Sequence, residues 1–368
     1  MRTVRVIGNV EPGGGQLSAL RLGVALERRG WSVHFLAGSA TPGGVELFRS
    51  HGLELDVYGA TRSLQYDCDE GFVSWLAPRL AEADLVHGHQ FGAWWAAARA
   101  ALPGVPVVGS EHNAYEWPAE PPLGGLRWAF DRLDRLFVHG PAAREQLLAM
   151  GADPALLHEG RSAIDSVEDV RPVPLPARRL VYAGRLHQEK GPDVLLEALA
   201  LVGDRPPLYL VGSGPFEDDL RRRARRLGIE ADVTFVGWSE RPADWIAGAR
   251  ACVVPSRRDA WSQTAVLAMA LAVPVVGTAV EGLTRVLSCG RGVAVAPEDP
   301  KALARALEHL LEGRVRTDLE GARGYAARFT SERVASLYEY SYAQLLAPVG
   351  SGSPTDPTDE MKHGVLQG

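Results

Sequence analysis

The sequence predicts an α/β protein made of two tandem domains, each built on a doubly wound parallel sheet. Short β-branched runs alternate with helical patterns along the chain, which is typical of a parallel sheet covered by helices on both faces. A proline-rich stretch at 170–177 interrupts this alternation, and closely spaced prolines continue neither a helix nor a sheet. The 368 residues are 46% hydrophobic, which suffices for two cores of ordinary size.

Strands are predicted where β-branched residues cluster between turn residues. In the first half of the chain these runs are 4–8, 32–36, 85–88, 107–110 and 135–139. After the prolines they are 179–183, 208–211, 233–236, 251–254, 275–277 and 292–295. Two such sheets in tandem are expected to face a cleft, because ligands of this architecture bind outside the carboxyl ends of the strands.

The proline-rich stretch also sets the predicted domain boundaries. A first domain spans 1–170, a second spans 171–330, and a last helical segment spans 331–348. The tail at 349–368 is rich in Gly, Ser, Pro, Thr and Asp and is expected to be disordered.

Composition narrows the class of protein. Cys68, Cys252 and Cys289 stand at unrelated spacings, so neither a disulfide framework nor a metal motif is expected. The chain opens on a strand-like run rather than a signal peptide, and no apolar run approaches the roughly 18 residues of a membrane-spanning helix. We therefore expect a soluble, cytoplasmic protein without stable membrane insertion. The net charge of −6 and the lack of a basic aromatic patch argue against nucleic-acid binding.

An acidic loop after a strand is the most informative motif. The strand ends at Pro255-Ser256, Asp259 follows, and an apolar helical pattern begins beyond Trp261. The first N–H groups of a helix have no partner within it, so such a helix start attracts anions. A carboxylate beside it suits a molecule that is a sugar at one end and a diphosphate at the other. The residues expected to contact that molecule are Asp259, Trp261, Ser262, Gln263 and Thr264.

A second motif, at 182–193, places two cations at a strand end. Gly184 turns the chain after the strand, and a helix with a first-turn proline begins just after Lys190. Arg185 and Lys190 are therefore expected at the carboxyl edge of the second sheet. There they can neutralise a diphosphate leaving group, Arg as a fork and Lys as a point charge. The alternative is that both are solvated loop cations.

Glycine-rich turns follow three further strands. Gly212 and Gly214 come after one strand of the second domain, and Gly237 ends another. Gly14 and Gly15 connect the first strand of the chain to its helix, and consecutive glycines let the backbone pass close to a phosphate or sugar. This loop lacks the spaced glycines of a dinucleotide-binding fingerprint, so a plain surface turn is the alternative.

The segments 184–191 and 253–277 resemble the sugar-nucleotide site of the retaining, GT-B-fold glycosyltransferases, of the type grouped as glycosyltransferase family 4 and glycosyl transferases group 1. The similar motifs follow the family's order over most of 8–282. The resemblance implies two Rossmann-like domains, the first binding the acceptor and the second the nucleotide sugar. It also implies that the segment 331–348 packs back on the first domain.

The resemblance implies roles for particular residues. Asp259 stands where the family carries a glutamate that contacts the donor sugar, whereas Leu267 replaces a second glutamate that contacts the ribose. Arg185 and Lys190 match the pair that binds the pyrophosphate, and His112 matches a histidine near the anomeric carbon. The catalytic residues are therefore predicted to be His112, Arg185, Lys190 and Asp259. The glycines predicted to line the donor are Gly14, Gly15, Gly184, Gly212, Gly214 and Gly237.

The first domain is the more acidic of the two. Residues 1–170 hold 21 Asp and Glu against 14 Lys and Arg, or −7, and the remainder holds 24 against 25, or +1. An acidic domain favours a cationic acceptor, such as an amino-sugar or aminocyclitol natural product, and repels phosphorylated ones. The candidate acceptor contacts are Glu11, Asp67, Asp69, Glu111, Glu116 and Trp117. The alternative is that the acids are ordinary surface and that the tryptophans, including Trp94 and Trp95, belong to the core.

Two histidines end a neighbouring strand of the first domain. His87 and His89 are separated by one residue, a spacing that also occurs in metal sites, but no further ligand cluster accompanies them. Hydrogen bonding or a place in the cleft wall is the expected role.

These expectations describe a retaining, metal-independent, hexosyltransferase-like enzyme. It moves a sugar from a nucleotide-diphosphate sugar, with UDP as the expected nucleotide, to a hydroxyl of a soluble small molecule, without a further cofactor. No Asp-x-Asp follows a strand of the second domain, so no divalent metal is implied. No convincing nucleophile appears, and the resemblance implies attack assisted by the leaving phosphate. Two alternatives remain: a nucleotide-sugar 2-epimerase of the same architecture, and a non-catalytic relative. The departures from the family pattern at Asp259, Leu267, Ala272 and Arg285 keep the second alternative open.

Overall fold

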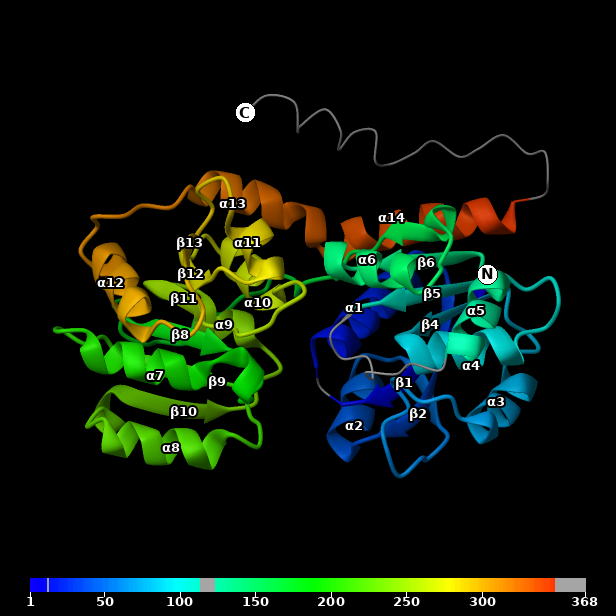
Figure 1. Cartoon of the computed structure of the whole chain (residues 1–368), viewed down its shortest axis with the longest axis horizontal. Coiled ribbons are helices and arrows are strands. Elements are labelled where there is room, and N and C mark those ends of the chain that lie inside the picture. The colour runs from blue at the N-terminus through cyan, green and yellow to red at the C-terminus, as the bar shows by residue number, and fades with distance from the viewer. Residues whose placement is uncertain (12, 113–122, 348–368) are drawn as a thin grey trace. The chain divides into compact units, whose positions relative to one another are not determined.

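A computed structural model describes residues 1–11, 13–112 and 123–347 of the chain. The chain divides into two compact units. Met1–Ala163 and the C-terminal segment from Ser331 form the first unit, and Ile164–Thr330 forms the second. Each unit is built on a parallel sheet (Figure 1), which confirms the predicted fold class.

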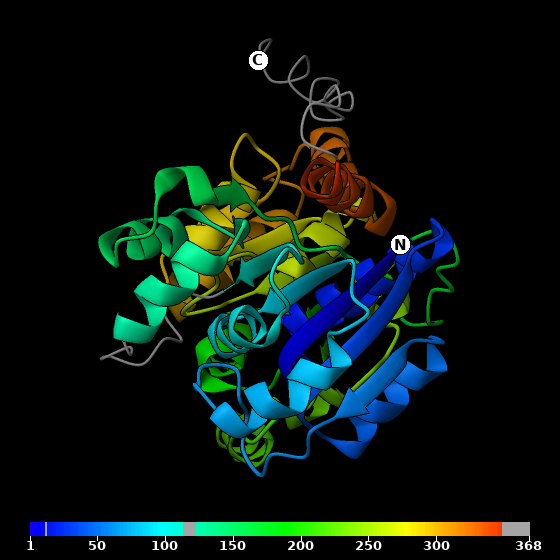
Figure 2. The same cartoon turned by 90° about the vertical axis from the view of Figure 1, so that its right-hand side faces the viewer.

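The first unit has a seven-stranded parallel sheet in the order β3-β2-β1-β4-β5-β6-β7. Its strands are β1 (Arg2–Val10), β2 (Ser32–Ala40), β3 (Glu54–Val57), β4 (Leu85–His89), β5 (Val107–Glu111), β6 (Arg135–Val138) and β7 (Leu157–Glu159). Its helices are α1 (Gly14–Arg28), α2 (Pro42–Ser50), α3 (Glu70–Leu76), α4 (Phe91–Ala100), α5 (Leu123–Arg132), α6 (Pro141–Ala149) and α14 (Ser331–Leu346). Figure 2 shows its strands, coloured blue to cyan, running side by side.

The second unit has a six-stranded parallel sheet in the order β10-β9-β8-β11-β12-β13. Its strands are β8 (Leu180–Ala183), β9 (Leu208–Val211), β10 (Val233–Gly237), β11 (Ala251–Val254), β12 (Val275–Thr278) and β13 (Val293–Val295). Its helices are α7 (Pro192–Leu201), α8 (Glu217–Arg226), α9 (Pro242–Ile246), α10 (Gln263–Ala270), α11 (Glu281–Leu287), α12 (Pro300–Leu311) and α13 (Leu319–Ala326). In both sheets the first strand of the unit is central, so the strand order reverses beside it, as in other doubly wound sheets.

Apolar patterning explains which elements are covered. β4, β5, β8 and β11 are buried along their whole length, as expected for strands covered on both faces. α4 is buried almost all round, and Trp94 and Trp95 lie in the core of the first unit. α8 instead buries only Leu220 and Ala224, and its first turn is acidic and its last turn basic, which suits a surface helix and its dipole. None of the described helices is both long enough and apolar enough to cross a bilayer.

Every run predicted as a strand forms one, but the sequence reading missed β3 and β7. Both lie at the edges of the first sheet and are short. An edge strand buries fewer side chains, so its residues carry a weaker apolar signal than those of a central strand. β3 alternates between exposed and half-buried positions along all its residues.

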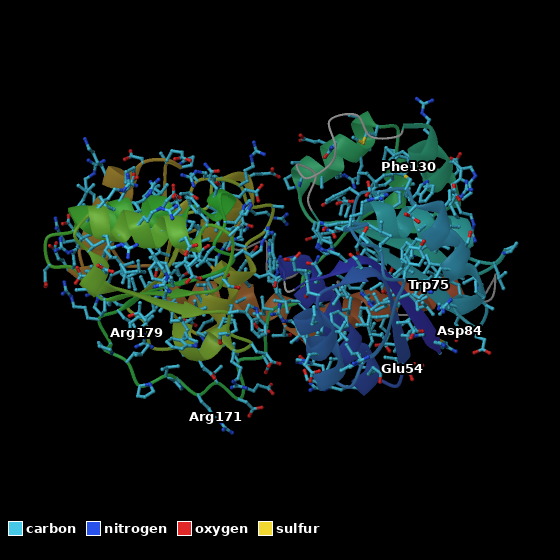
Figure 3. The ribbon with its side chains drawn as sticks, turned by 90° about the horizontal axis from the view of Figure 1, so that it is seen from below. Glu54, Trp75, Asp84, Phe130, Arg171 and Arg179 are labelled. Carbon is cyan, nitrogen blue, oxygen red and sulfur yellow. The ribbon has the colours of Figure 1, made fainter. Side chains whose placement is uncertain are left out.

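The proline-rich stretch does not mark the division between the units. The chain passes into the second unit after Ala163, so the predicted boundary after residue 170 lies inside that unit. The backbone N–H groups of Arg171 and Val173 donate to the Asp244 carboxylate and carbonyl, at 2.8 and 2.9 Å. Figure 3 labels Arg171 and Arg179 near the two ends of this stretch. Prolines prevent regular structure here, but these hydrogen bonds still fix the stretch to α9.

The last helix completes the first unit. α14 packs on α1, and its Val334, Tyr338 and Tyr342 are buried in the core that α1 shares. Glu339 of α14 accepts hydrogen bonds from Arg29 at 2.6 Å and from the Trp31 indole at 3.0 Å. This helix therefore delivers two tyrosines to the central strands of the first sheet.

Candidate active site

A lysine and an aspartate form an ion pair at the carboxyl edge of the second sheet. Lys190 Nζ lies 3.1 Å from Asp259 Oδ2, and Ser256 donates a hydrogen bond to the same oxygen at 3.2 Å. The Asp259 side chain is 7% exposed and that of Lys190 is 23% exposed. The structure thus brings together two of the predicted catalytic residues, from the turns that follow β8 and β11.

Glycine makes the close approach of these turns possible. Gly191 has φ +64°, and a Cβ there would lie 2.0 Å from the carbonyl oxygen of Pro255. Gly212 has φ +145°, and a Cβ there would lie 1.9 Å from the carbonyl oxygen of Gly184. Any side chain at either position would force the turns apart, because real Cβ atoms do not approach an oxygen so closely. These tight turns therefore require glycine at both positions.

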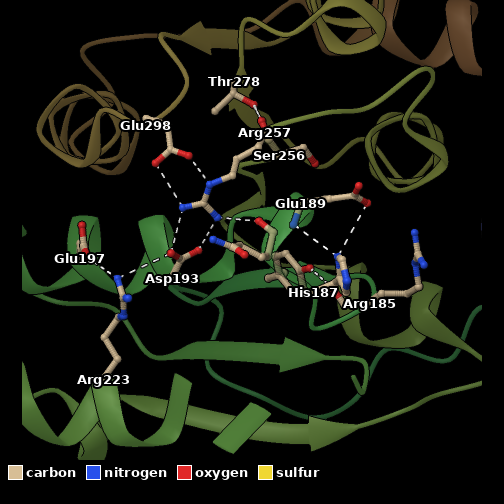
Figure 4. A network of polar contacts seen from close by, with 12 residues as sticks. Arg185, His187, Glu189, Asp193, Glu197, Arg223, Ser256, Arg257, Thr278 and Glu298 are labelled. Atoms are coloured by element: carbon tan, nitrogen blue, oxygen red, sulfur yellow. Dashed lines mark hydrogen bonds and ion pairs between the residues drawn. The ribbon is translucent and has the colours of Figure 1, made fainter. Parts of the chain in front are cut away.

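Arg257 ties the two turns together, as Figure 4 shows. Its Nη1 and Nη2 donate to the two carboxylate oxygens of Asp193 at 2.7 and 2.9 Å, and Nη1 also donates to the Gln188 carbonyl at 2.6 Å. Burial alone raises the pKa of the Asp193 carboxyl, but the hydrogen bonds and charge of Arg257 outweigh it and lower that pKa. Glu298 binds Arg257 from the other side.

Sequence reasoning missed Arg257 as a site-building residue. Arg257 comes directly after the strand end at Pro255-Ser256, but its partner Asp193 is 64 residues away in the chain. No spacing rule connects the two, so only the fold shows that Arg257 fixes the Lys190 turn.

Arg185 differs from Lys190 in its surroundings. Its side chain is exposed, and within the described parts of the chain no partner holds it. Figure 4 shows it pointing away from the Arg257 network. Its own carbonyl accepts a hydrogen bond from the Tyr182 hydroxyl at 2.6 Å, which fixes the backbone of the turn. The backbone of Arg185 is thus fixed, while its exposed guanidinium can bind an anion.

α10 begins where the sequence predicted a helix, but the side chains around its first turn bond and pack within the second unit. Ser262 caps the helix by accepting from the Ala265 N–H at 3.3 Å, and the Thr264 hydroxyl donates to the Ala183 carbonyl at 2.8 Å. The half-buried Trp261 ring packs 4.8 Å from Phe329. α10 thereby presents backbone N–H groups at its first turn, beside Asp259, with no acidic residue in that turn. Gln263 begins the helix.

Leu267 lies inside the hydrophobic core of the second unit. It is 4% exposed and packs with the other apolar residues of α10. A leucine here contributes to packing and offers no oxygen to a ribose. Gly237, at the end of β10, has φ +85° and its carbonyl accepts from the Gly212 N–H at 2.7 Å, which fixes the two glycine turns to each other.

In the first unit, the glycine loop lies beside His112. A Cβ on Gly15 would lie 3.8 Å from the imidazole ring of His112, and Gly14 begins α1. α1 starts without a side-chain cap and without an acid in its first turn. His112 is 8% exposed, and its Nε2 has no hydrogen-bond partner among the described residues.

His112 belongs to a buried group of four histidines. Its ring lies 4.0 Å from His139 and 6.0 Å from His89, and His89 stacks 4.3 Å from His87. Burial is the largest cause that lowers the pKa of each ring, and it lowers the pKa of His112 to about 4. All four imidazoles are therefore neutral near pH 7. In the described part of the chain, no group of three or more His, Cys, Asp or Glu is placed to hold a metal ion.

The predicted acceptor contacts separate into different environments. Glu111 is completely buried and accepts a hydrogen bond from the Trp94 indole at 3.4 Å, so we reassign it from the acceptor to the core. Asp69 caps α3 through the Phe72 N–H at 2.7 Å, and Asp67 pairs with Arg62 at 2.7 Å. Glu11 is exposed. The two other candidates, Glu116 and Trp117, lie outside the described residues.

Comparison with known proteins identifies the family of the chain. Residues 12–161 match the family described as Glycosyltransferase Family 4, and residues 177–313 match Glycosyl transferases group 1. The chain is 33% identical to D-inositol 3-phosphate glycosyltransferase 2 of Catenulispora acidiphila, over 72% of each chain. It is 30% identical to D-inositol 3-phosphate glycosyltransferase of Mycobacterium tuberculosis (strain H37Ra), over 92% of this chain and 80% of the relative.

Solved structures show the same fold. Anabaena HepE in complex with UDP-glucose superposes with a TM-score of 0.79 at 19% identity, over 94% of this chain and all of that one. Sucrose-phosphate synthase from Thermosynechococcus elongatus gives a TM-score of 0.76 at 22% identity, over 94% and 99%. With its family 4 and group 1 domains, its two Rossmann-like units and its relatives, the chain belongs to the GT-B glycosyltransferases, enzymes that use a nucleotide sugar.

Proposed function

We propose that this glycosyltransferase moves a sugar from a UDP-sugar to a hydroxyl of a soluble cyclitol-type small molecule, with retention at the anomeric carbon and without a metal ion. The observation that carries the proposal is the pairing of Lys190 with the buried Asp259, beside the exposed Arg185 and the start of α10. One short stretch of the sheet edge thus offers a sugar-binding carboxylate and two cations.

Sugar transfer requires positive charge near the diphosphate that leaves. When the bond between the anomeric carbon and the diphosphate breaks, negative charge grows on the leaving oxygen. Lys190, Arg185 and the first N–H groups of α10 are proposed to stabilise that charge, because fixed donors and dipoles need no reorganisation as it develops. Asp259 is proposed to accept hydrogen bonds from the hydroxyls of the donor sugar, and His112 to contact the same sugar.

Retention and metal independence follow from the same groups. A retaining transfer places the acceptor hydroxyl on the face that the diphosphate leaves, so a leaving phosphate oxygen can take the acceptor's proton. Lys190 and Arg185 carry the positive charge that a divalent cation supplies in other nucleotide-sugar enzymes. No further cofactor enters the proposal.

UDP is the proposed nucleotide. HepE, whose fold this chain shares, was solved with UDP and with UDP-glucose. The ribose contact differs from the family pattern, because Leu267 is a core residue here. Backbone groups near Gly237 and the half-exposed Trp238 ring are proposed to hold the nucleoside instead.

The acceptor is proposed to be a cyclitol that carries an amino group. The relatives are named for inositol 3-phosphate, which supports a cyclitol ring. Residues 1–170 carry a formal charge of −7, from 21 acidic and 14 basic residues, which favours a cationic ring over a phosphorylated one. The relatives are transferases by name, which favours transfer over the epimerase alternative.

Nucleotide binding is tested by thermal unfolding with UDP, GDP, TDP and ADP. UDP at about 100 times its Kd is expected to stabilise the protein by about 2.7 kcal/mol and raise Tm by several degrees. Arg185→Ala should bind UDP more weakly at an unchanged apo Tm, because Arg185 is exposed. Arg226→Ala, which removes an exposed arginine of α8, is the matched control and should respond like the wild type. If no nucleotide raised Tm, the non-catalytic alternative would replace this proposal.

A further inference from the structure

A buried cluster of polar side chains occupies the centre of the first unit. β1 supplies an arginine, β4 two histidines and α14 two tyrosines, and all are nearly or fully buried: Arg5, His87, His89, Tyr338 and Tyr342. His112 and His139 complete it at the ends of β5 and β6. The proposed function uses only His112, so the role of the other members is open.

Arg5 carries a buried charge that no carboxylate among the described residues neutralises. Its Nη2 bonds His89 Nε2 at 2.8 Å and its Nη1 bonds the Tyr342 hydroxyl at 3.2 Å. A guanidinium only donates hydrogen bonds and keeps its protons in proteins. His89 Nε2 must therefore accept, which places the hydrogen of a neutral His89 ring on Nδ1.

The donor and acceptor roles are also fixed at Tyr342. Its oxygen already accepts from Arg5, and its hydroxyl lies 2.5 Å from His87 Nδ1. If His87 Nδ1 were the donor, the tyrosine hydrogen would have no acceptor, because these two are its hydrogen-bond partners among the described residues. Tyr342 therefore donates to His87 Nδ1, and His87 Nε2–H donates to the Ser110 hydroxyl at 2.8 Å. A single fixed charge thus sets the tautomers of two histidines, in opposite senses.

We propose that Arg5, acting directly and through Tyr342, is a positioning residue that holds His87 as the Nε2–H tautomer and His89 as the Nδ1–H tautomer. The cluster thereby presents His112 to the donor sugar as a neutral imidazole in a fixed orientation. The second part rests on the proposed function, whereas the tautomers do not.

The same hydrogen bonds favour neutral His87 and His89 rings, because they occupy the lone pairs at which either ring would take a further proton. Protonation of His87 or His89 would displace a hydrogen bond that its lone pair accepts and add a charge beside Arg5. Among the described residues, the ionisable side chains around His112 are those of Arg5, His87, His89, His139, Tyr338 and Tyr342, together with the buried Glu111 that precedes it on β5. The charges that act on the pKa of His112 and its three neighbours are those of Arg5 and of one another, with no carboxylate among them. Glu111 is buried and accepts a hydrogen bond from the Trp94 indole.

The test is a long-range proton–nitrogen NMR spectrum of the full chain labelled in histidine, which reports both ring nitrogens of each imidazole. His87→Gln and His89→Gln assign the two signals. We expect His87 as Nε2–H and His89 as Nδ1–H, both unchanged between about pH 5.5 and 8. A wild-type His87 protonated on Nδ1, or a His87 or His89 ring that gains a proton near pH 6.5, would overturn the proposal.

Tyr342→Phe separates the two arms of the network. It removes the donor to His87 but leaves the Arg5–His89 bond, so His87 should become a tautomer mixture while His89 stays Nδ1–H. Tyr340→Phe, on the same helix, is the matched control and should change neither. An unchanged His87 in Tyr342→Phe would also overturn the proposal.

Kinetics test the link to His112. Tyr342→Phe should lower kcat by about tenfold with little change in the donor KM, because the ring orientation and not the binding surface is altered. The acid limb of its kcat profile should move to higher pH, which a purely structural loss would not cause. If the NMR results held but no protein transferred sugar, the proposed function would fail while the assignment of Arg5 would stand.

Discussion

Replacing Lys190 with alanine is expected to lower kcat/KM for sugar transfer by about a hundred- to a thousandfold, or about 3–4 kcal/mol of transition-state stabilisation. Lys190 is a point charge aimed at the sheet edge where the diphosphate is proposed to leave, and it also holds the Asp259 carboxylate at 3.1 Å. The variant therefore loses a donor to the leaving group and an orienting contact for the sugar-binding acid. The measurement is the initial rate of UDP release with acceptor present.

The chain offers a matched control for this substitution. Its three lysines are Lys190, Lys301 and Lys362, and Lys301 is an exposed residue at the start of α12. Lys301→Ala should retain wild-type kcat/KM. Because Lys190→Ala leaves Asp259 buried with only Ser256, some stability is lost as well. The double variant Lys190→Met with Asp259→Asn should regain stability without regaining activity. Full activity in either site variant would refute the assignment of Lys190.

Acid is expected to destabilise the first unit between pH 7 and pH 5, by about 2 kcal/mol from His112 alone. His87, His89, His112 and His139 are buried, and each has its pKa lowered, to about 4 for His112 and well below the ordinary value for the others. In the unfolded chain they take up protons below about pH 6.5. At pH 5 this uptake favours the unfolded state by about 2 kcal/mol at His112, and the other three rings act in the same direction.

The sign of the effect follows from linkage. Above pH 6.5 both states leave these rings neutral, so the stability is complete; it falls as the pH drops from 6.5 toward the folded-state values. A loss of about 2 kcal/mol is already a large fraction of the stability of a typical domain. Urea denaturation at a series of pH values measures it. Removing one ring of the cluster, as in His139→Gln, should reduce the slope. A denaturation midpoint that is constant from pH 7 to 5 would contradict the neutral cluster.

The fold could be predicted from the sequence because the patterns that indicate its strands and helices are local. β-branched runs marked each central strand, and Pro192 after Gly191 marked a helix start. The edge strands β3 and β7 were not predicted because they bury few side chains. The predicted domain boundary was wrong because prolines indicate only that regular structure is absent, not where one unit ends. The proline-rich stretch is in fact hydrogen-bonded to Asp244 of α9, within the second unit.

The candidate site was accessible only in part. Motif order placed Lys190 and Asp259 at strand ends, but their ion pair depends on the Gly191 turn packing against Pro255. Burial removed Glu111 from the predicted acceptor contacts, which charge counting had included. The contact of Arg5 with Tyr342 joins residues 337 positions apart, and no local pattern announces it. Long-range polar pairs are set by topology, so a single sequence does not reveal them.

The most direct test of the central claim is the anomeric configuration of the product, read by proton NMR. The enzyme would be incubated with UDP-glucose and a chelator, and with an aminocyclitol or inositol 3-phosphate as acceptor. Retaining, metal-independent transfer predicts an α-linked glucoside and UDP release that requires the acceptor. Preference for inositol 3-phosphate would correct the acceptor and leave the mechanism intact. A β-linked product, or transfer that the chelator abolishes, would contradict the proposed chemistry of Lys190, Arg185 and Asp259.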